Sequence, residues 1–153
     1  MDHMVEMTLR NLVVGGGPIP SAIILQPASD ENDSELVLPI SVGTVDAANV
    51  ARATNADDHT RPATHALLVD TIDALGGELE SVSITRVEGA TFFATLDVRS
   101  ATGEQHHIDA RPSDAISAAI EADAPVLASE DVLECAGLPD FAAVERDEQE
   151  REA

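Results

Sequence analysis

The sequence has no lysine, tryptophan or tyrosine, only one cysteine, and no long apolar run. Because Cys135 has no second cysteine to pair with, we expect no disulfide framework and no cysteine-based zinc site, and Cys135 itself should pack as a small apolar residue. A membrane-spanning helix needs about 20 apolar residues in succession, so no membrane contact is predicted. Acidic Asp2 and Glu6 stand where a secretory signal peptide would be basic, and we therefore expect a cytoplasmic protein.

Basic residues are also scarce, since eight arginines stand against 29 acidic residues and give a formal net charge of −21. A surface so rich in carboxylates repels itself in dilute buffer, but at about 1 M salt the Debye length is roughly 3 Å and the repulsion is screened. Such acidity without lysine is typical of a halophilic protein. In molar salt local contacts decide binding, so a nucleic-acid partner is not excluded, although no basic patch indicates one.

Alternating apolar residues and turn signals divide the chain into short strands and helices. We expect strands over residues 5–14, 21–26, 35–40, 81–88, 91–99, 104–110 and 126–127, and helices over residues 45–53, 62–75, 112–122 and 130–136. The first three strands are separated by turns and one acidic loop, which predicts an antiparallel meander.

These elements predict a single α+β domain over residues 1–140, with a mixed, mainly antiparallel sheet and helices packed on it. The length of 153 residues fits one domain with a substantial core. The acidic tail at residues 141–153 has little to bury, and we expect it to be disordered. Exposed sheet edges and a small core with few aromatic side chains favour a homo-oligomer.

The stretch Ile108–Ser129 organises the rest of the chain as a strand, a helix and a second strand. Pro112 suits the first helical position, because its φ is fixed near the helical value and it has no N–H to satisfy. Asp114 falls in the first turn, where the helix dipole favours a carboxylate. Asp123 is expected to take the left-handed cap that glycine usually fills, and Pro125 prevents the helix from continuing.

Five segments of the chain carry the next inference: LPISVGTVDA (38–47), RPATHALL (61–68), TFFATL (91–96), IDARPSDAI (108–116) and DAPVLAS (123–129). In this order they resemble the bifunctional nuclease family. The resemblance covers about residues 5–133. It implies a compact α+β domain and a nuclease activity on both DNA and RNA.

Three positions depart from what is usual in that family. Asp46 stands where the family usually has glutamate, which keeps the charge on a shorter side chain. Ala66 stands where an aspartate usually follows the Thr–His pair, so a possible ligand or hydrogen-bond acceptor is missing. Asp123 stands where the family usually has glycine, a change in the backbone rather than in the chemistry.

Phosphodiester hydrolysis needs an activated water and stabilisation of the charge that grows on phosphate, and a divalent cation held by carboxylates supplies both. The candidate catalytic carboxylates and metal ligands are Asp46, Asp109 and Asp114, which all flank predicted helix starts. This set would suffice for Mg²⁺ or Mn²⁺, since Mg²⁺ takes one or two protein carboxylates and keeps several waters. His65 is the candidate general base, because histidine titrates near neutrality.

Two arginines each precede a proline at a predicted helix start, Arg61 before one helix and Arg111 before the other. A planar guanidinium forms two parallel hydrogen bonds to phosphate. The N–H groups at the start of the helix that follows Arg111 would add to that binding. We therefore assign Arg61, Arg111 and Ser113 to phosphate binding.

Each candidate also has a structural interpretation. Asp114 could cap its own helix, and Asp109 could pair with Arg111. Further alternatives are an ion pair of Arg61 with Asp57 or Asp58, a helix-dipole role for Asp46, and packing of His65 beside Val69 and Ile72. The adjacent His106 and His107 point to opposite faces of a strand, so they cannot form a site together and have no assigned role.

Three functional hypotheses remain. The leading one is a metal-assisted nuclease that hydrolyses DNA and RNA. The second is a non-catalytic regulatory module that binds an anion or nucleic acid at the Arg–Pro helix starts, and the third is an oligomeric scaffold. The observation that separates them best is whether Asp46, His65, Asp109 and Asp114 converge in one pocket.

Overall fold

The computed structural model describes residues 3–29, 36–55, 60–140 and 151. Its strands are β1 (Met4–Val13), β2 (Ser21–Pro27), β3 (Leu36–Val42), β4 (Glu78–Glu88), β5 (Thr91–Arg99), β6 (Gln105–Ala110), β7 (Val126–Ser129) and β8 (Leu138–Pro139). Its helices are α1 (Thr44–Thr54), α2 (Thr64–Ala74), α3 (Pro112–Ala122) and α4 (Glu130–Ala136). Every predicted strand and helix is present, with its ends shifted by at most a few residues.

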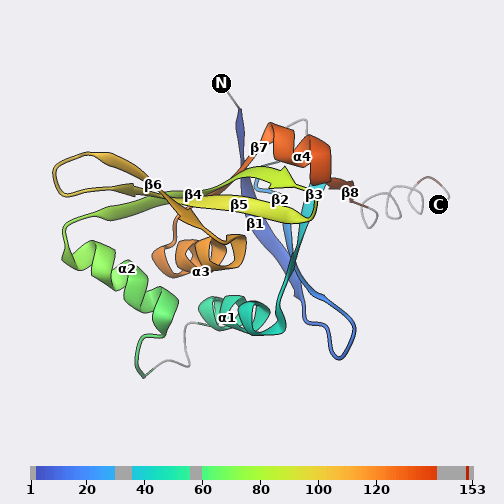
Figure 1. Ribbon diagram of the computed structural model, residues 1–153, viewed down its shortest axis with the longest axis horizontal. Helices are drawn as coiled ribbons and strands as arrows, with labels where there is room; N and C mark the ends of the chain where they lie inside the picture. The colour runs from blue at the N-terminus through green and yellow to red at the C-terminus, as the bar shows by residue number, and fades with distance from the viewer. Residues whose placement is uncertain (1–2, 30–35, 56–59, 141–150, 152–153) are drawn as a thin grey trace.

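The strands form one eight-stranded sheet in the order β6-β5-β4-β7-β1-β2-β3-β8 (Figure 1). The first three strands make the predicted antiparallel meander. Strands β4 and β7 run parallel, whereas the other neighbouring pairs are antiparallel. The fold is therefore the predicted single α+β domain with a mixed, mainly antiparallel sheet.

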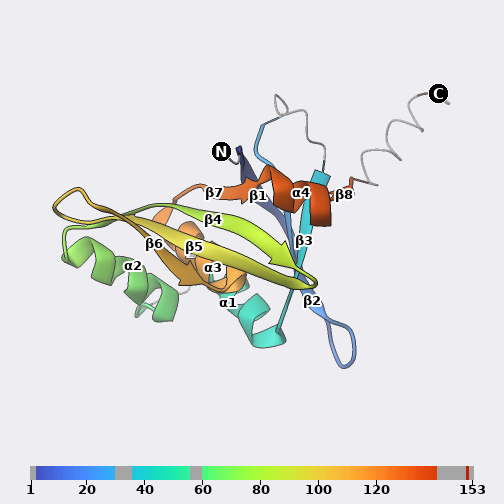
Figure 2. The same cartoon turned by 45° about the horizontal axis from the view of Figure 1, so that its top comes forward.

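Helices cover the sheet from both sides. In Figure 1, α1, α2 and α3 lie below the strands and α4 lies above them, and the first three helices stay grouped in the tilted view of Figure 2. The core lies where the helices meet the sheet, and Ile23, Leu25, Val82 and Ile84 are completely buried there. In the described part of the chain, no helix is long and apolar enough to cross a membrane.

Helix α3 carries the chain from the edge strand β6 to β7 in the middle of the sheet. Pro112 opens it as predicted. Its inner face consists largely of small residues such as Ala115, Ala118 and Ala119, all at most 1% exposed, together with Ile116. Because small side chains allow close approach, α3 packs against both α1 and α2, and this packing brings the starts of the three helices near one another.

One helix start differs from the prediction. The chain stays extended through Ala63, with φ −78° and ψ 177°, so that α2 begins at Thr64 and not at Pro62. The first helical hydrogen bond of α2 runs from the Leu67 N–H to the Ala63 carbonyl, at 2.8 Å. The two-residue strand β8, which pairs with the start of β3, was not predicted, because two residues are too few to show any periodicity.

The prediction for Cys135 is wrong, since this cysteine is exposed. Helix α4 turns Val132 and Leu133 into the core, whereas Cys135 lies outside this buried face. The predicted tail at residues 141–153 lies outside the described residues, apart from residue 151.

Asp123 adopts the left-handed conformation expected of it, with φ 53° and ψ 40°, as the C-cap of α3. A non-glycine residue is strained there, and a negative charge is unfavourable at the C-terminal end of a helix. We predict that Asp123→Gly raises the free energy of unfolding by about 0.5–1 kcal/mol in denaturant titration. The matched control is Asp123→Ala, which removes the charge but keeps the backbone strain and should therefore stabilise less than glycine.

Candidate functional site

The guanidinium of Arg111 joins two carboxylates at the start of α3. Its terminal nitrogens donate to the two carboxylate oxygens of Asp46 at 3.1 and 3.2 Å, and its Nε donates to Asp114 at 2.9 Å. Asp46 lies in the first turn of α1 and Asp114 in the first turn of α3. Arg111 itself is the N-cap residue of α3 in an extended conformation, and its side chain is 64% exposed.

A histidine from a third helix completes this arrangement. His65, in the first turn of α2, lies with Nε2 at 2.8 Å from the second carboxylate oxygen of Asp114. Burial alone would raise the pKa of Asp114, but hydrogen bonds from His65 and Arg111, and the charges of both, lower it. An ionised carboxylate can only accept, so Nε2 of His65 is the donor. In the neutral form of the ring, Nδ1 is then left as an acceptor.

We call Asp46, His65, Arg111 and Asp114 the helix-start cluster. The three hydrogen bonds of Arg111 use three of the five N–H donors that a guanidinium carries, so two remain for a ligand. None of α1, α2 and α3 has a side-chain cap, in contrast to α4, where the Ser129 hydroxyl accepts from a backbone N–H. The positive ends of three uncapped helices therefore meet around one exposed arginine.

Of the other predicted site residues, Asp109 lies elsewhere. In β6 it stands opposite Thr95 of β5, and strand alternation places it on the sheet face that points away from α3. Ser113 lies beside the cluster in sequence but is 5% exposed, so its hydroxyl offers little surface to a ligand. Arg61 is exposed before α2 and, within the described residues, no hydrogen bond or ion pair joins it to the cluster.

The structural alternatives are decided in part. The side chain of Asp114 does not cap its own helix. Arg111 pairs with Asp46 and Asp114, and not with Asp109. Asp46 therefore forms an ion pair with Arg111 in addition to its favourable interaction with the dipole of its own helix. The alternative pairing of Arg61 with residues 57 or 58 lies outside the described residues.

The helix-start cluster does not fit a divalent cation between its two carboxylates. Asp46 directs both oxygens at Arg111, and Asp114 directs one at Arg111 and one at His65. The guanidinium, which is itself a cation, occupies the position between them. Within the described residues, no three His, Cys, Asp or Glu side chains are grouped so that they could hold a metal ion. The expected need for Mg²⁺ or Mn²⁺ stays a prediction.

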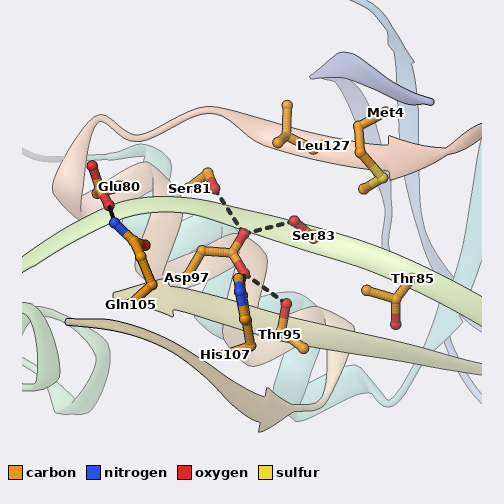
Figure 3. A pocket seen from close by; sticks show the side chains of 10 residues that line it. All are labelled: Met4, Glu80, Ser81, Ser83, Thr85, Thr95, Asp97, Gln105, His107 and Leu127. Carbon is orange, nitrogen blue, oxygen red and sulfur yellow. Dashed lines mark hydrogen bonds and ion pairs between the residues drawn. The ribbon is translucent and has the colours of Figure 1, made fainter. Parts of the chain in front are cut away.

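A second polar network lies on the sheet face that points away from α3, which we call the open face (Figure 3). Its centre is Asp97 of β5, which is 7% exposed. This carboxylate accepts hydrogen bonds from Ser81 at 2.7 Å, Ser83 at 2.6 Å, Thr95 at 2.9 Å and Nδ1 of His107 at 2.8 Å. Burial alone would raise the pKa of Asp97, but these four hydrogen bonds together lower it.

The open-face network borders a pocket of about 550 Å³, whose rim also includes Met4, Glu80 and Leu127. Neither Asp97 nor His107 was among the site residues predicted from the sequence. The sequence did predict that His106 and His107 face opposite ways, and the register, with His107 opposite Asp97, agrees. The missed signal was an aspartate inside an otherwise apolar strand, TFFATLDV, beside a strand with serines at alternate positions.

With this geometry in place, comparison with known proteins identifies the class. The bifunctional nuclease domain matches residues 24–140, which contain the whole helix-start cluster. Two proteins of Mycobacterium tuberculosis described as uncharacterized, Rv1829 of strain H37Rv and MT1877 of strain CDC 1551, are each 35% identical to this chain over 108 residues. That similarity covers 71% of this chain and 63% of each relative. The chain belongs to the bifunctional nuclease domain family.

The open-face network predicts an acid-sensitive contribution to stability. Because the pKa of Asp97 is lowered in the folded state, its contribution is present above the ordinary aspartate value of about 3.9 and is lost as the pH falls toward the folded-state value. We predict that Asp97→Asn lowers the free energy of unfolding at pH 7 by about 1.5–3 kcal/mol in denaturant titration. The loss should shrink when the titration is repeated below pH 4. Asp70→Asn, on the exposed side of α2, is the control and should change little.

Proposed function

We propose that this chain hydrolyses phosphodiester bonds of DNA and RNA at the helix-start cluster. The observation that carries the proposal is the meeting of Asp46, His65, Arg111 and Asp114 from the first turns of three helices. Membership of the bifunctional nuclease domain family supports the reaction class. The activity and the nucleic-acid substrate are proposals for this chain, because it matches less than two thirds of the length of its uncharacterized relatives.

In the proposed reaction the phosphate lies against the two outward N–H donors of Arg111. The uncapped first turns of the helices add backbone N–H groups, which favour an anion. Charge that develops on the phosphate oxygens is stabilised by the guanidinium, and Asp46 fixes the orientation of that guanidinium through two hydrogen bonds.

The nucleophile in this scheme is a water molecule. His65 takes its proton at Nδ1, because the hydrogen bond from Nε2 to Asp114 fixes the tautomer and stabilises the imidazolium that forms. The water oxygen forms a new bond to phosphorus while the bond to one ester oxygen breaks. The proton then passes from the imidazolium to the leaving oxygen, which restores His65.

The test is cleavage of labelled RNA and DNA by the protein purified in molar KCl. We predict that Arg111→Ala and His65→Gln each lower the rate by about 100-fold or more while the fold persists by circular dichroism. The matched control is Arg99→Ala, an exposed arginine that pairs with Glu78 on the sheet and should keep the full rate. Assays with Mg²⁺, Mn²⁺ and EDTA test the cation requirement separately.

Two outcomes would contradict this assignment. Cleavage that survives both cluster variants would place the activity at another site or in a contaminant. Binding of RNA that depends on Arg111, without any cleavage, would instead support the non-catalytic module. The observation that favours this module is that Arg111 already forms ion pairs with both carboxylates of the cluster.

We further propose that the protein works in a salt-rich cytoplasm, since its net charge of −21 without any lysine requires screening. Raising KCl from about 0.2 M to about 2 M should raise the melting temperature by about 5 °C or more in a calorimetric scan, as repulsion between carboxylates is screened. A sugar at equal osmolality is the control and should have a much smaller effect. Equal melting temperatures at both salt concentrations would refute this proposal.

A further inference from the structure

The edge strand β6 is a conspicuous unpaired surface. It ends the sheet beyond β5, and in the described part of the chain no strand pairs with its outer side. Its residues 105–109 are all exposed, and Ile108 retains 48% of its surface in solvent. An edge of this kind presents a row of backbone N–H and C=O groups that can pair with another strand.

The side chains of β6 are arranged unusually for an edge. His107 is 66% exposed, yet its ring is held by the buried carboxylate of Asp97 through Nδ1. Three hydroxyl groups fix that carboxylate in turn, as Figure 3 shows. The imidazole is therefore oriented with Nε2 directed away from Asp97. The proposed nuclease mechanism uses none of these groups.

We propose that β6 pairs antiparallel with β6 of a second copy of this chain, centred on Ile108, so that the two sheets become continuous. The pairing places His107 of each copy opposite Asp109 of the partner subunit, and Ile108 opposite Ile108 of the partner subunit. This inference goes beyond the proposed nuclease function and does not depend on it.

The register follows from symmetry and charge. A two-fold axis perpendicular to the sheet keeps each face on the same side, and directly opposite residues share a face. The axis must therefore lie midway between the two copies of one residue, which face each other. Centring on Ile108 gives two pairs of opposite charge on the open face and one apolar pair on the other face. Centring on His107 would instead place two imidazoles against each other, which is unfavourable when both are protonated.

The groups that face His107 explain why a histidine suits this edge. On the open face they are Asp97 from β5, Glu80 from β4 and, two residues along its own strand, Asp109. A protonated imidazole donates from both nitrogens, and so would join Asp97 to Asp109 of the partner subunit. Contact pairs of this kind lie within the Debye length of about 3 Å at 1 M salt, so concentrated salt does not abolish them.

Cysteine cross-linking tests the register directly. In a Cys135→Ser background, Ile108→Cys should give a disulfide-linked dimer under mild oxidation, because directly opposite Cα atoms are about 4.5–5.5 Å apart. His106→Cys is the matched control and should not cross-link, since its two copies would be about 14 Å apart. Failure of Ile108→Cys to cross-link, or equal cross-linking of both variants, would overturn the proposed pairing.

Analytical ultracentrifugation of the full chain tests the charge pairs. Asp109→Arg should weaken dimerisation about tenfold or more relative to wild type, whereas Glu134→Arg, the same charge change on exposed α4, should not. Equal dissociation constants for Asp109→Arg and Glu134→Arg, or a monomer at all concentrations, would refute the proposal.

Discussion

The contact on which the rest of the candidate site depends is the shared hydrogen bonding of the Arg111 guanidinium to Asp46 and Asp114. Each carboxylate lies in the first turn of its own helix, where the dipole already favours negative charge. The guanidinium between them holds α1 and α3 in a fixed relation, and the hydrogen bond that His65 donates to Asp114 adds α2. One cationic group thus determines how three helix starts are placed.

The sheet keeps two chemistries apart by the alternation of its side chains. On the face that meets α3, residues such as Val82 and Leu96 build the core. On the open face, the same strands present hydroxyls, a buried carboxylate and an exposed imidazole. The carboxylate of Asp97 can be buried because four hydrogen-bond donors compensate for its lost hydration.

The sequence predicted the elements of this fold well because the deciding signals are local. Pro112 opens α3 because its φ is fixed near the helical value, and Asp123, followed by Pro125, ends it in the left-handed conformation that aspartate tolerates better than most residues. The spacing of apolar residues is an equally local signal, since they recur at every second position in strands and at every third or fourth position in helices. The shift of the α2 start to Thr64 and the exposure of Cys135 depend on which face meets the rest of the molecule, which local signals do not contain.

What the sequence by itself determined was therefore the fold class, the order of the elements and three of the four residues expected to converge, namely Asp46, His65 and Asp114. Only the tertiary structure decided that Asp109 lies on the other face of the sheet and that Asp97 joins His107. The physical reason is that a strand residue's neighbours are set by pairing and register between distant segments. Those relations exist only once the chain has folded.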